Sequence, residues 1–266
     1  MQKVRQSLEI PVRSECDVLV VGAGPAGMGA AITAARNGAR VTLVEYGGKL
    51  GGMWTLGLLS PFFDNRKEGL NKEIREKLME RKAWGGLWDI SFDPVEMALL
   101  LNRYAMELDI DVLLYTIACE PFMEDREVRG VFVQNKSGKQ LIRAKAVIDC
   151  TGDGDIAARA GCPFEVGRPE DGAFQPMTMM FKLGGVRREY PADRILDWYT
   201  VLEKRVKDRE QFEEDVPFTF PALIKLPREG EALVQWTHIR KLSGSDGDQL
   251  SKAAQEGFRQ VEKAMQ

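Results

Sequence analysis

The chain has 266 residues, enough for one large domain or two small ones. Its 37 Lys and Arg residues against 40 Asp and Glu residues give a formal net charge of −3. This slightly acidic balance argues against a nucleic-acid partner, which usually meets a basic surface, and gives no attraction to an anionic membrane.

The cysteines and the first residues of the chain bear on its setting in the cell. No two cysteines are spaced as C-x-x-C, so neither a zinc site nor an iron–sulfur cluster is predicted, and no metal is expected. Residues 1–17 carry charges throughout, unlike the apolar core of a signal peptide, and no apolar run is long enough to span a bilayer. We therefore expect a reduced, cytoplasmic protein without a membrane segment.

The strongest motif follows the first predicted strand. Residues 16–21 are a short apolar run, typical of a strand buried on both faces of a parallel sheet. A G-x-G-x-x-G motif comes directly after it and comprises Gly22, Ala23, Gly24, Pro25, Ala26 and Gly27. Residues 26–37 are rich in Ala and predict a helix, residues 40–44 predict a second strand, and Glu45 ends that strand.

Each part of this motif has a physical role in binding a dinucleotide. Gly22 permits a tight turn, Gly24 lets the backbone approach a pyrophosphate, and Gly27 permits close packing of helix and strand. The N-terminus of the helix offers free N–H groups and the positive end of its dipole to that pyrophosphate. Glu45 can accept hydrogen bonds from the adenosine ribose. The alternative is a βαβ unit whose glycines serve packing alone.

The segment after Glu45 favours FAD over a nicotinamide cofactor. A simple nicotinamide-binding domain continues with another helix and a parallel strand, whereas the glycine density of residues 46–55 predicts a loop. Such a loop can pass close to a large flat ligand because glycine has no side chain.

These motifs resemble the FAD-dependent oxidoreductases of the glutathione-reductase-like superfamily. The resemblance is closest to the family that also contains the heterodisulfide-reductase-like flavoproteins, and it covers the chain from about Asp17 to its end. The stretches that carry it are residues 21–27, 45–53, 92–94, 135–138, 146–155 and 175–178.

The resemblance implies which residues hold FAD. In the superfamily the glycine motif binds the pyrophosphate and the glutamate binds the adenosine ribose. A second Gly-Gly loop lies along the dinucleotide, a Thr-Gly-Asp turn closes over it, and a meander strand passes the adenine. The cofactor-binding residues implied here are Gly22, Ala23, Gly24, Pro25, Ala26, Gly27, Glu45, Gly51, Gly52, Met53, Ala118, Thr151, Gly152 and Asp153.

The middle of the chain predicts the rest of this domain. The expected helices cover residues 71–82 and 93–108, and the expected parallel strands cover residues 111–115 and 146–149. Asp93 is interpreted as the N-cap of the second of these helices. Residues 116–144 contain three short strand-like runs that predict an inserted antiparallel meander. Asp155 is expected to cap a short helix over residues 156–160 rather than to bind a metal.

From residue 167 the pattern changes, and we expect a domain on the substrate side. Residues 174–183 predict a strand, residues 191–207 a helix, and residues 216–240 several short strands. The candidates for catalysis or for positioning a substrate are Arg168, Gln175, Thr178 and His238. His238 is the only histidine and could act as a general acid or base, although an ordinary strand histidine is the favoured interpretation.

Together these patterns predict an α/β fold. Residues 1–165 form a Rossmann-like FAD/NAD(P)-binding domain with a parallel sheet and an inserted β-meander, and residues 166–245 form a smaller α+β substrate, or cap, domain. The helix of residues 246–266 could rejoin the first domain. The superfamily usually returns to the FAD domain with a last strand and a Gly-Asp turn, and no such segment follows residue 240, so a chain lacking the usual C-terminal part is expected.

The expected function is that of an FAD-dependent oxidoreductase. It would transfer hydride or electrons between bound flavin and an unidentified small organic substrate. Two alternatives stay open: an NAD(P)-dependent reductase, and a non-catalytic fragment or assembly subunit that retains the fold without flavin. At the family level a homodimer is expected, or a partner segment that supplies the missing C-terminal part.

Overall fold

A computed structural model describes residues 4, 7–186 and 222–265 of the chain. The chain divides into two compact units. The first unit comprises Met1–Gly52 and Leu101–Phe164, and the second unit comprises Met53–Leu100 and Glu165–Gln266. The predicted division into an FAD-binding domain and a substrate domain is a statement about function and stays a prediction.

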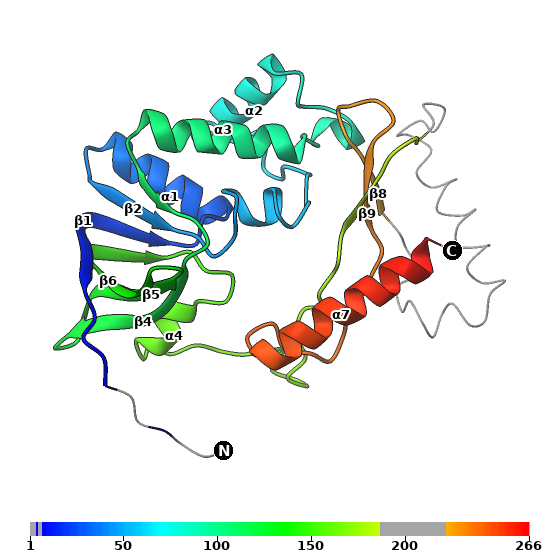
Figure 1. Cartoon of the computed structure of the whole chain (residues 1–266). Helices are drawn as coiled ribbons and strands as arrows, with labels where there is room; N and C mark the ends of the chain where they lie inside the picture. Colours follow the sequence, from blue (N-terminus) through cyan, green and yellow to red (C-terminus); the bar gives the residue numbers. More distant parts are fainter. Residues whose placement is uncertain (1–3, 5–6, 187–221, 266) are drawn as a thin grey trace. The chain divides into compact units, whose positions relative to one another are not determined.

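A six-stranded sheet forms the centre of the first unit, with the strand order β3-β2-β1-β6-β5-β4 (Figure 1). Its strands are β1 (Val12–Val21), β2 (Val41–Val44), β3 (Asp111–Leu113), β4 (Ile117–Glu124), β5 (Glu127–Asn135) and β6 (Gly138–Asp149). The first three strands and β6 pair in parallel, whereas β4, β5 and β6 pair antiparallel. With helix α1 (Pro25–Arg36) between β1 and β2, this arrangement confirms the predicted Rossmann-like α/β fold.

The core of the first unit joins the parallel strands to the antiparallel hairpin. Leu19 and Val21 of β1 belong to the same buried cluster as Val131 and Val133 of β5. Helix α1 packs on β1 and β2 through a buried face that includes Ala31. Small residues on this face allow the helix backbone to lie close to the sheet.

The prediction of a separate strand over residues 146–149 is wrong in its extent. The last run of the meander and this parallel strand are one continuous strand, β6. Residues 139–149 contain no glycine or proline that would interrupt them, so the strand runs on. The first half of β6 pairs with β5 and also with β1, and its second half pairs with β1 as far as Asp149 opposite Val21.

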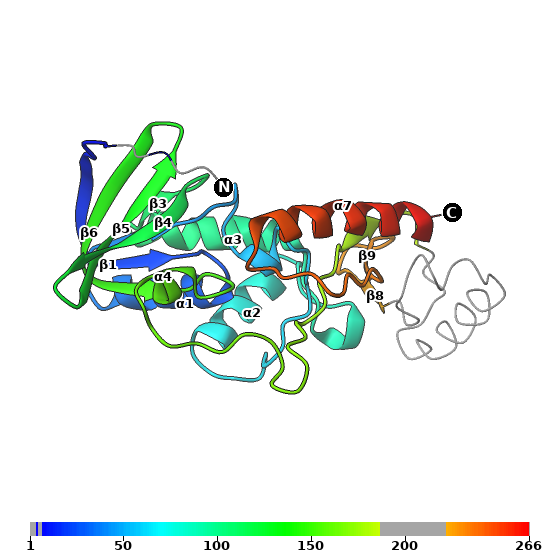
Figure 2. The same cartoon turned by 90° about the horizontal axis from the view of Figure 1, so that it is seen from below.

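The second unit combines helices with a small antiparallel sheet. Its elements include α2 (Leu70–Glu80), β7 (Phe181–Leu183), β8 (Ala222–Lys225), β9 (Ala232–Gln235), α7 (Gly247–Ala264) and the 3-10 turn Leu87–Asp89. A further 3-10 turn, Gly52–Trp54, begins at the last residue of the first unit's first segment. The strands form a sheet in the order β7-β9-β8. Figure 2 shows α7 alongside β8 and β9, and Ala264 at its end packs against Val234 and Trp236.

Two expectations for the second part of the chain need comment. The predicted strand over residues 174–183 is shorter, because only Phe181–Leu183 forms a strand and Met177 makes an isolated bridge. The predicted helix over residues 191–207 lies outside the described residues.

Helix α3 (Pro94–Glu107) begins as predicted, since the Oδ1 atom of Asp93 accepts hydrogen bonds from the first-turn N–H groups.

Within residues 7–186 and 222–265, no helix is both long enough and apolar enough to cross a bilayer.

Candidate functional site

Three loops of the first unit meet where parallel strands end. They follow β1, β2 and β6, which are neighbours in the sheet. The Gly22 N–H donates to the Val44 carbonyl at 2.8 Å, and the Cys150 N–H donates to the Val21 carbonyl at 2.8 Å. In open α/β sheets, ligands bind at the carboxyl ends of the strands, so this edge is the candidate site.

Two glycines of the motif are required by the protein's own packing. Gly22 has a φ of +93°, which an L side chain rarely adopts, and an added Cβ would lie 2.5 Å from the Cys150 carbonyl oxygen. A Cβ on Gly27 would lie 1.7 Å from the Gly22 carbonyl oxygen. The turn and the helix could not lie this close with larger residues at these two positions.

Gly24 differs from these two glycines. It is the N-cap of α1 with ordinary extended dihedral angles, φ −67° and ψ −174°, and an added Cβ would meet no described atom within 4 Å. No described side chain caps α1, and the first turn of the helix contains no acidic residue. A helix N-terminus with unpaired N–H groups attracts an anion, so the geometry fits the pyrophosphate of FAD.

Glu45 connects the loops that follow β1 and β2. Its side chain is buried, with the residue 8% exposed, and each carboxylate oxygen accepts one backbone hydrogen bond. The Ala23 N–H donates to Oε2 at 2.8 Å and the Gly47 N–H donates to Oε1 at 2.6 Å. A carboxylate oxygen has two lone-pair positions, so each oxygen can accept one further hydrogen bond, such as one from a ribose hydroxyl.

The loop that contains Gly51 and Gly52 lies directly against the loop of the glycine motif after β1. The Gly51 N–H donates to the Ala23 carbonyl at 2.7 Å. A Cβ on Gly52 would lie 2.8 Å from the Cα of Gly24. Pro25 and Ala26 are exposed at the start of α1, and Met53, at the first position of the second unit, is also exposed.

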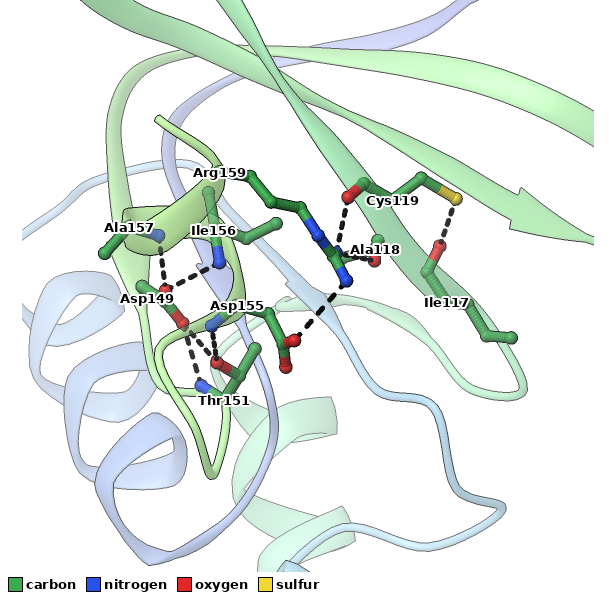
Figure 3. A network of polar contacts seen from close by, with 9 residues as sticks. All are labelled: Ile117, Ala118, Cys119, Asp149, Thr151, Asp155, Ile156, Ala157 and Arg159. Atoms are coloured by element: carbon green, nitrogen blue, oxygen red, sulfur yellow. Dashed lines mark hydrogen bonds and ion pairs between the residues drawn. The ribbon is translucent and has the colours of Figure 1, made fainter. Parts of the chain in front are cut away.

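Asp149 holds the turn after β6, a role that the sequence analysis did not assign (Figure 3). Its Oδ1 atom accepts from the N–H and the hydroxyl of Thr151 at 3.0 and 2.7 Å. Its Oδ2 atom accepts from the N–H groups of Ile156 and Ala157 at 2.9 and 2.8 Å. Burial opposes ionisation, but these four hydrogen bonds outweigh it and lower the pKa of Asp149 below its usual value.

The prediction that Asp155 caps the following helix is therefore wrong. Helix α4 (Asp155–Arg159) begins after Gly154, and the carboxylate that binds its first-turn N–H groups comes from Asp149. Asp155 lies within the helix and pairs with Arg159 at 3.4 Å. Asp149 lies outside the few residues around the helix start that a capping pattern covers, so the sequence did not indicate it.

The network in Figure 3 also reaches the edge strand β4. The Arg159 guanidinium donates to the Cys119 carbonyl at 2.5 Å and to the Ala118 carbonyl at 3.5 Å. Ala118, the expected adenine neighbour, thus lies close to α4. Gly152 and Asp153 are exposed in the turn between β6 and α4.

The cysteine at this turn does not have the properties of a reactive thiol. Burial raises the pKa of Cys150, and the neighbouring Asp149 carboxylate raises it further. Among the described residues, no group of three or more His, Cys, Asp or Glu side chains is placed to hold a metal ion.

The four catalytic candidates all lie in the second unit, and the structure brings two of them together. Met177 and Ile239 form an antiparallel bridge, and the Met179 N–H donates to the Thr237 hydroxyl at 2.7 Å. Thr178 and His238 therefore occupy opposite positions between these two contacts. The pKa of His238 is lowered, first by burial and then by the charge of Arg240.

The other two candidates do not join this pair. Arg168 is exposed and makes a two-pronged ion pair with Asp171, at 3.0 and 2.5 Å, within its own tight turn. The side chain of Gln175 is exposed. Neither residue belongs to the pairing around the Met177–Ile239 bridge that places Thr178 opposite His238.

Several known proteins are similar to this chain. Thiamine thiazole synthase of Aeropyrum pernix is 32% identical over 165 residues, which are 58% of this chain and 60% of that protein. The chain thus spans about three fifths of this curated relative. The structure of the myxobacterial chondrochloren halogenase, a variant of FAD-dependent halogenases, has a TM-score of 0.59 and 12% identity over 95% of this chain and 57% of its own. L-proline dehydrogenase from P. horikoshii has a TM-score of 0.53 and 14% identity over 93% of this chain and 76% of its own.

The structural likenesses show the fold, because their sequence identities are low. The sequence carries the family assignment. The model of the family described as FAD dependent oxidoreductase matches residues 17–266, nearly the whole chain. The chain belongs to the FAD dependent oxidoreductase family, with FAD as its cofactor.

Proposed function

We propose that the first unit binds the ADP half of FAD and that the chain acts as an oxidoreductase on a small organic substrate. The observation that carries this proposal is the start of α1 at Gly24. The protein's own packing requires Gly22 and Gly27, yet no atom of the described residues occupies the space where a Gly24 side chain would lie. A glycine with open space at an uncapped helix N-terminus is what a bound pyrophosphate needs.

Each element of the edge then has a role toward the cofactor. The start of α1 binds the pyrophosphate, Glu45 accepts hydrogen bonds from the ribose, and Gly51 and Gly52 leave room along the dinucleotide. The turn of Thr151, Gly152 and Asp153, held by Asp149, closes over the ligand. The chemistry that FAD supplies when bound is the transfer of hydride or electrons.

The second unit is proposed to meet the substrate. Thr178 and His238 are the two candidates that lie opposite each other, and the lowered pKa of His238 keeps its imidazole neutral near pH 7. A neutral imidazole can accept a proton or a hydrogen bond from a substrate. The substrate itself, the cytoplasmic setting, the homodimer and the place among the heterodisulfide-reductase-like flavoproteins remain predictions.

The test compares two aspartate substitutions on one helix. Gly24→Asp places a favoured N-cap residue at the start of α1, so the unliganded protein should keep or gain stability. Its carboxylate would occupy the anion site and repel the pyrophosphate. Gly29→Asp is the matched control, because it adds the same charge to α1 at a glycine that also has open space. We expect purified wild type and Gly29→Asp to retain visible flavin bands after incubation with FAD and desalting, and Gly24→Asp to lose them.

Three outcomes would contradict the proposal. Retention of flavin by Gly24→Asp would mean that the start of α1 is not the pyrophosphate site. A folded wild-type chain that retains no flavin would contradict FAD binding by this chain alone and would favour a fragment that needs another segment. Retention of a nicotinamide cofactor without flavin bands would favour the NAD(P)-dependent alternative.

A further inference from the structure

Tyr115 has an unusual conformation at the candidate site. It follows β3, at the same edge of the sheet as Glu45, and its φ is +52°, in the left-handed region that bulky residues rarely adopt. Two backbone hydrogen bonds hold it there: the Tyr115 N–H donates to the Gly47 carbonyl at 3.1 Å, and the Thr116 N–H donates to the Glu45 carbonyl at 3.0 Å. The conformation is thus imposed by the turn that also carries Glu45.

The turn after β2 makes room for the tyrosine ring. A Cβ on Gly48 would lie 2.2 Å from the Tyr115 hydroxyl oxygen and 2.5 Å from the adjoining ring carbon. The ring therefore lies against the backbone at Gly48, while Tyr115 as a whole is 73% exposed. Little apolar burial compensates for the backbone strain. Strained residues that the surrounding structure holds in place are concentrated at ligand sites.

The position of Tyr115 relates it to one part of the proposed ligand. Gly47 donates a hydrogen bond to the Glu45 carboxylate and accepts one from the Tyr115 N–H. Gly47 therefore links Tyr115 through hydrogen bonds to the Glu45 carboxylate, which is proposed to bind the ribose. It also precedes Ala118, the expected adenine neighbour, by three positions. The adenine is attached to the same ribose, so it lies within reach of a side chain at this place.

We infer that the exposed ring of Tyr115 stacks on the adenine of FAD and contributes to the affinity for the ADP half. This inference rests on the proposed function, since it takes FAD as the ligand of this edge. An exposed aromatic face next to a ribose site offers a flat apolar surface, and stacking of a base on an aromatic side chain contributes affinity without requiring a hydrogen bond.

The test compares two substitutions, one that removes the aromatic ring and one that keeps it. Tyr115→Gly removes the ring but suits the positive φ, so the melting temperature should not fall below that of the wild type. We expect its dissociation constant for FAD to rise roughly tenfold or more, within the range known for loss of base stacking. Tyr115→Phe keeps the ring and should bind FAD within about twofold of the wild type, because the stack does not need the hydroxyl.

Smaller probes separate this inference from the proposed function. ADP should lose affinity for Tyr115→Gly by the same factor as FAD, whereas inorganic pyrophosphate, which has no adenine, should bind both proteins equally. A wild type that binds no FAD would contradict the proposed function. A wild type that binds FAD, with Tyr115→Gly binding it equally well, would contradict only the stacking role. Equal losses for Tyr115→Phe and Tyr115→Gly would also overturn it, because the hydroxyl would then be the contact.

Discussion

Replacing Asp149 with asparagine tests how the turn after β6 is held. The carboxylate accepts two hydrogen bonds on each oxygen, from Thr151 on one side and from the start of α4 on the other. Asparagine has the same shape but only one acceptor oxygen, so its NH₂ group would face one pair of donors. Two of the four hydrogen bonds are therefore lost in either orientation of the amide.

The expected loss of stability follows from the number of hydrogen bonds that are lost. A hydrogen bond to a charged group contributes about 1.5–3 kcal/mol. Because Asp149 is only half-buried, the lower value applies, and the loss of two bonds should reduce the free energy of unfolding by about 3 kcal/mol. For a chain of this size, the melting temperature should fall by roughly 6–12 °C.

Urea unfolding and hydrogen exchange would measure this effect. The amides of Ile156 and Ala157 should exchange faster in Asp149→Asn, and the affinity for FAD should fall because the closing turn is less well held. Asp153→Asn is the matched control for stability and hydrogen exchange, since it removes the same charge from an exposed position in the same turn. A change below about 0.5 kcal/mol, with unchanged exchange at these two amides, would refute the assignment of Asp149 as the residue that holds the turn.

The stability difference between wild type and Asp149→Asn should also depend on pH in a defined direction. The folded-state pKa of Asp149 lies below its usual value, so its contribution is fully present above the unfolded-state pKa, near 4. That contribution is lost as the pH falls through the folded-state value. The stability difference between wild type and Asp149→Asn should therefore be constant from about pH 5 to neutrality and should shrink below about pH 4.

Two further substitutions test the packing of the motif and the strand histidine. Gly27→Ala should destabilise the first unit by about 3 kcal/mol in urea unfolding, because its Cβ would lie 1.7 Å from the Gly22 carbonyl oxygen; near-wild-type stability would contradict this packing. The lowered pKa of His238 means that the unfolded chain takes up a proton first, so the wild type should lose stability as the pH falls below about 6.5. His238→Gln should reduce that loss in thermal unfolding between pH 5 and 6.5, and identical pH profiles would show that this histidine does not contribute.

The sequence predicts the first unit well where the signals are local. The apolar run before Gly22, the spacing of the glycines and the strand ending at Glu45 each specify a feature of one short segment, and the structure reproduces their order. Asp93 likewise caps α3 as its position before a proline indicates. These elements could be predicted because backbone geometry and a few neighbouring residues determine them.

The features that the sequence did not predict depend on contacts distant in the chain. The turn of residues 150–154 separates Asp149 from the N–H groups of Ile156 and Ala157 that it binds, so no capping pattern includes it. The conformation of Tyr115 is set by hydrogen bonds to the turn after β2, nearly seventy residues earlier. The sequence also does not reveal that residues 53–100, which separate β2 from β3, belong to the second compact unit.

The continuity of β6 limits how the sheet of the first unit can unfold locally. One strand carries both the parallel pairing with β1 and the antiparallel pairing with β5. Neither group of strands can separate from the sheet without breaking hydrogen bonds to a strand that the other also uses. The amides of β1, β5 and β6 should therefore be protected from exchange as one cooperative folding unit. The loops at the candidate site would then be attached to the part of the first unit that opens least often.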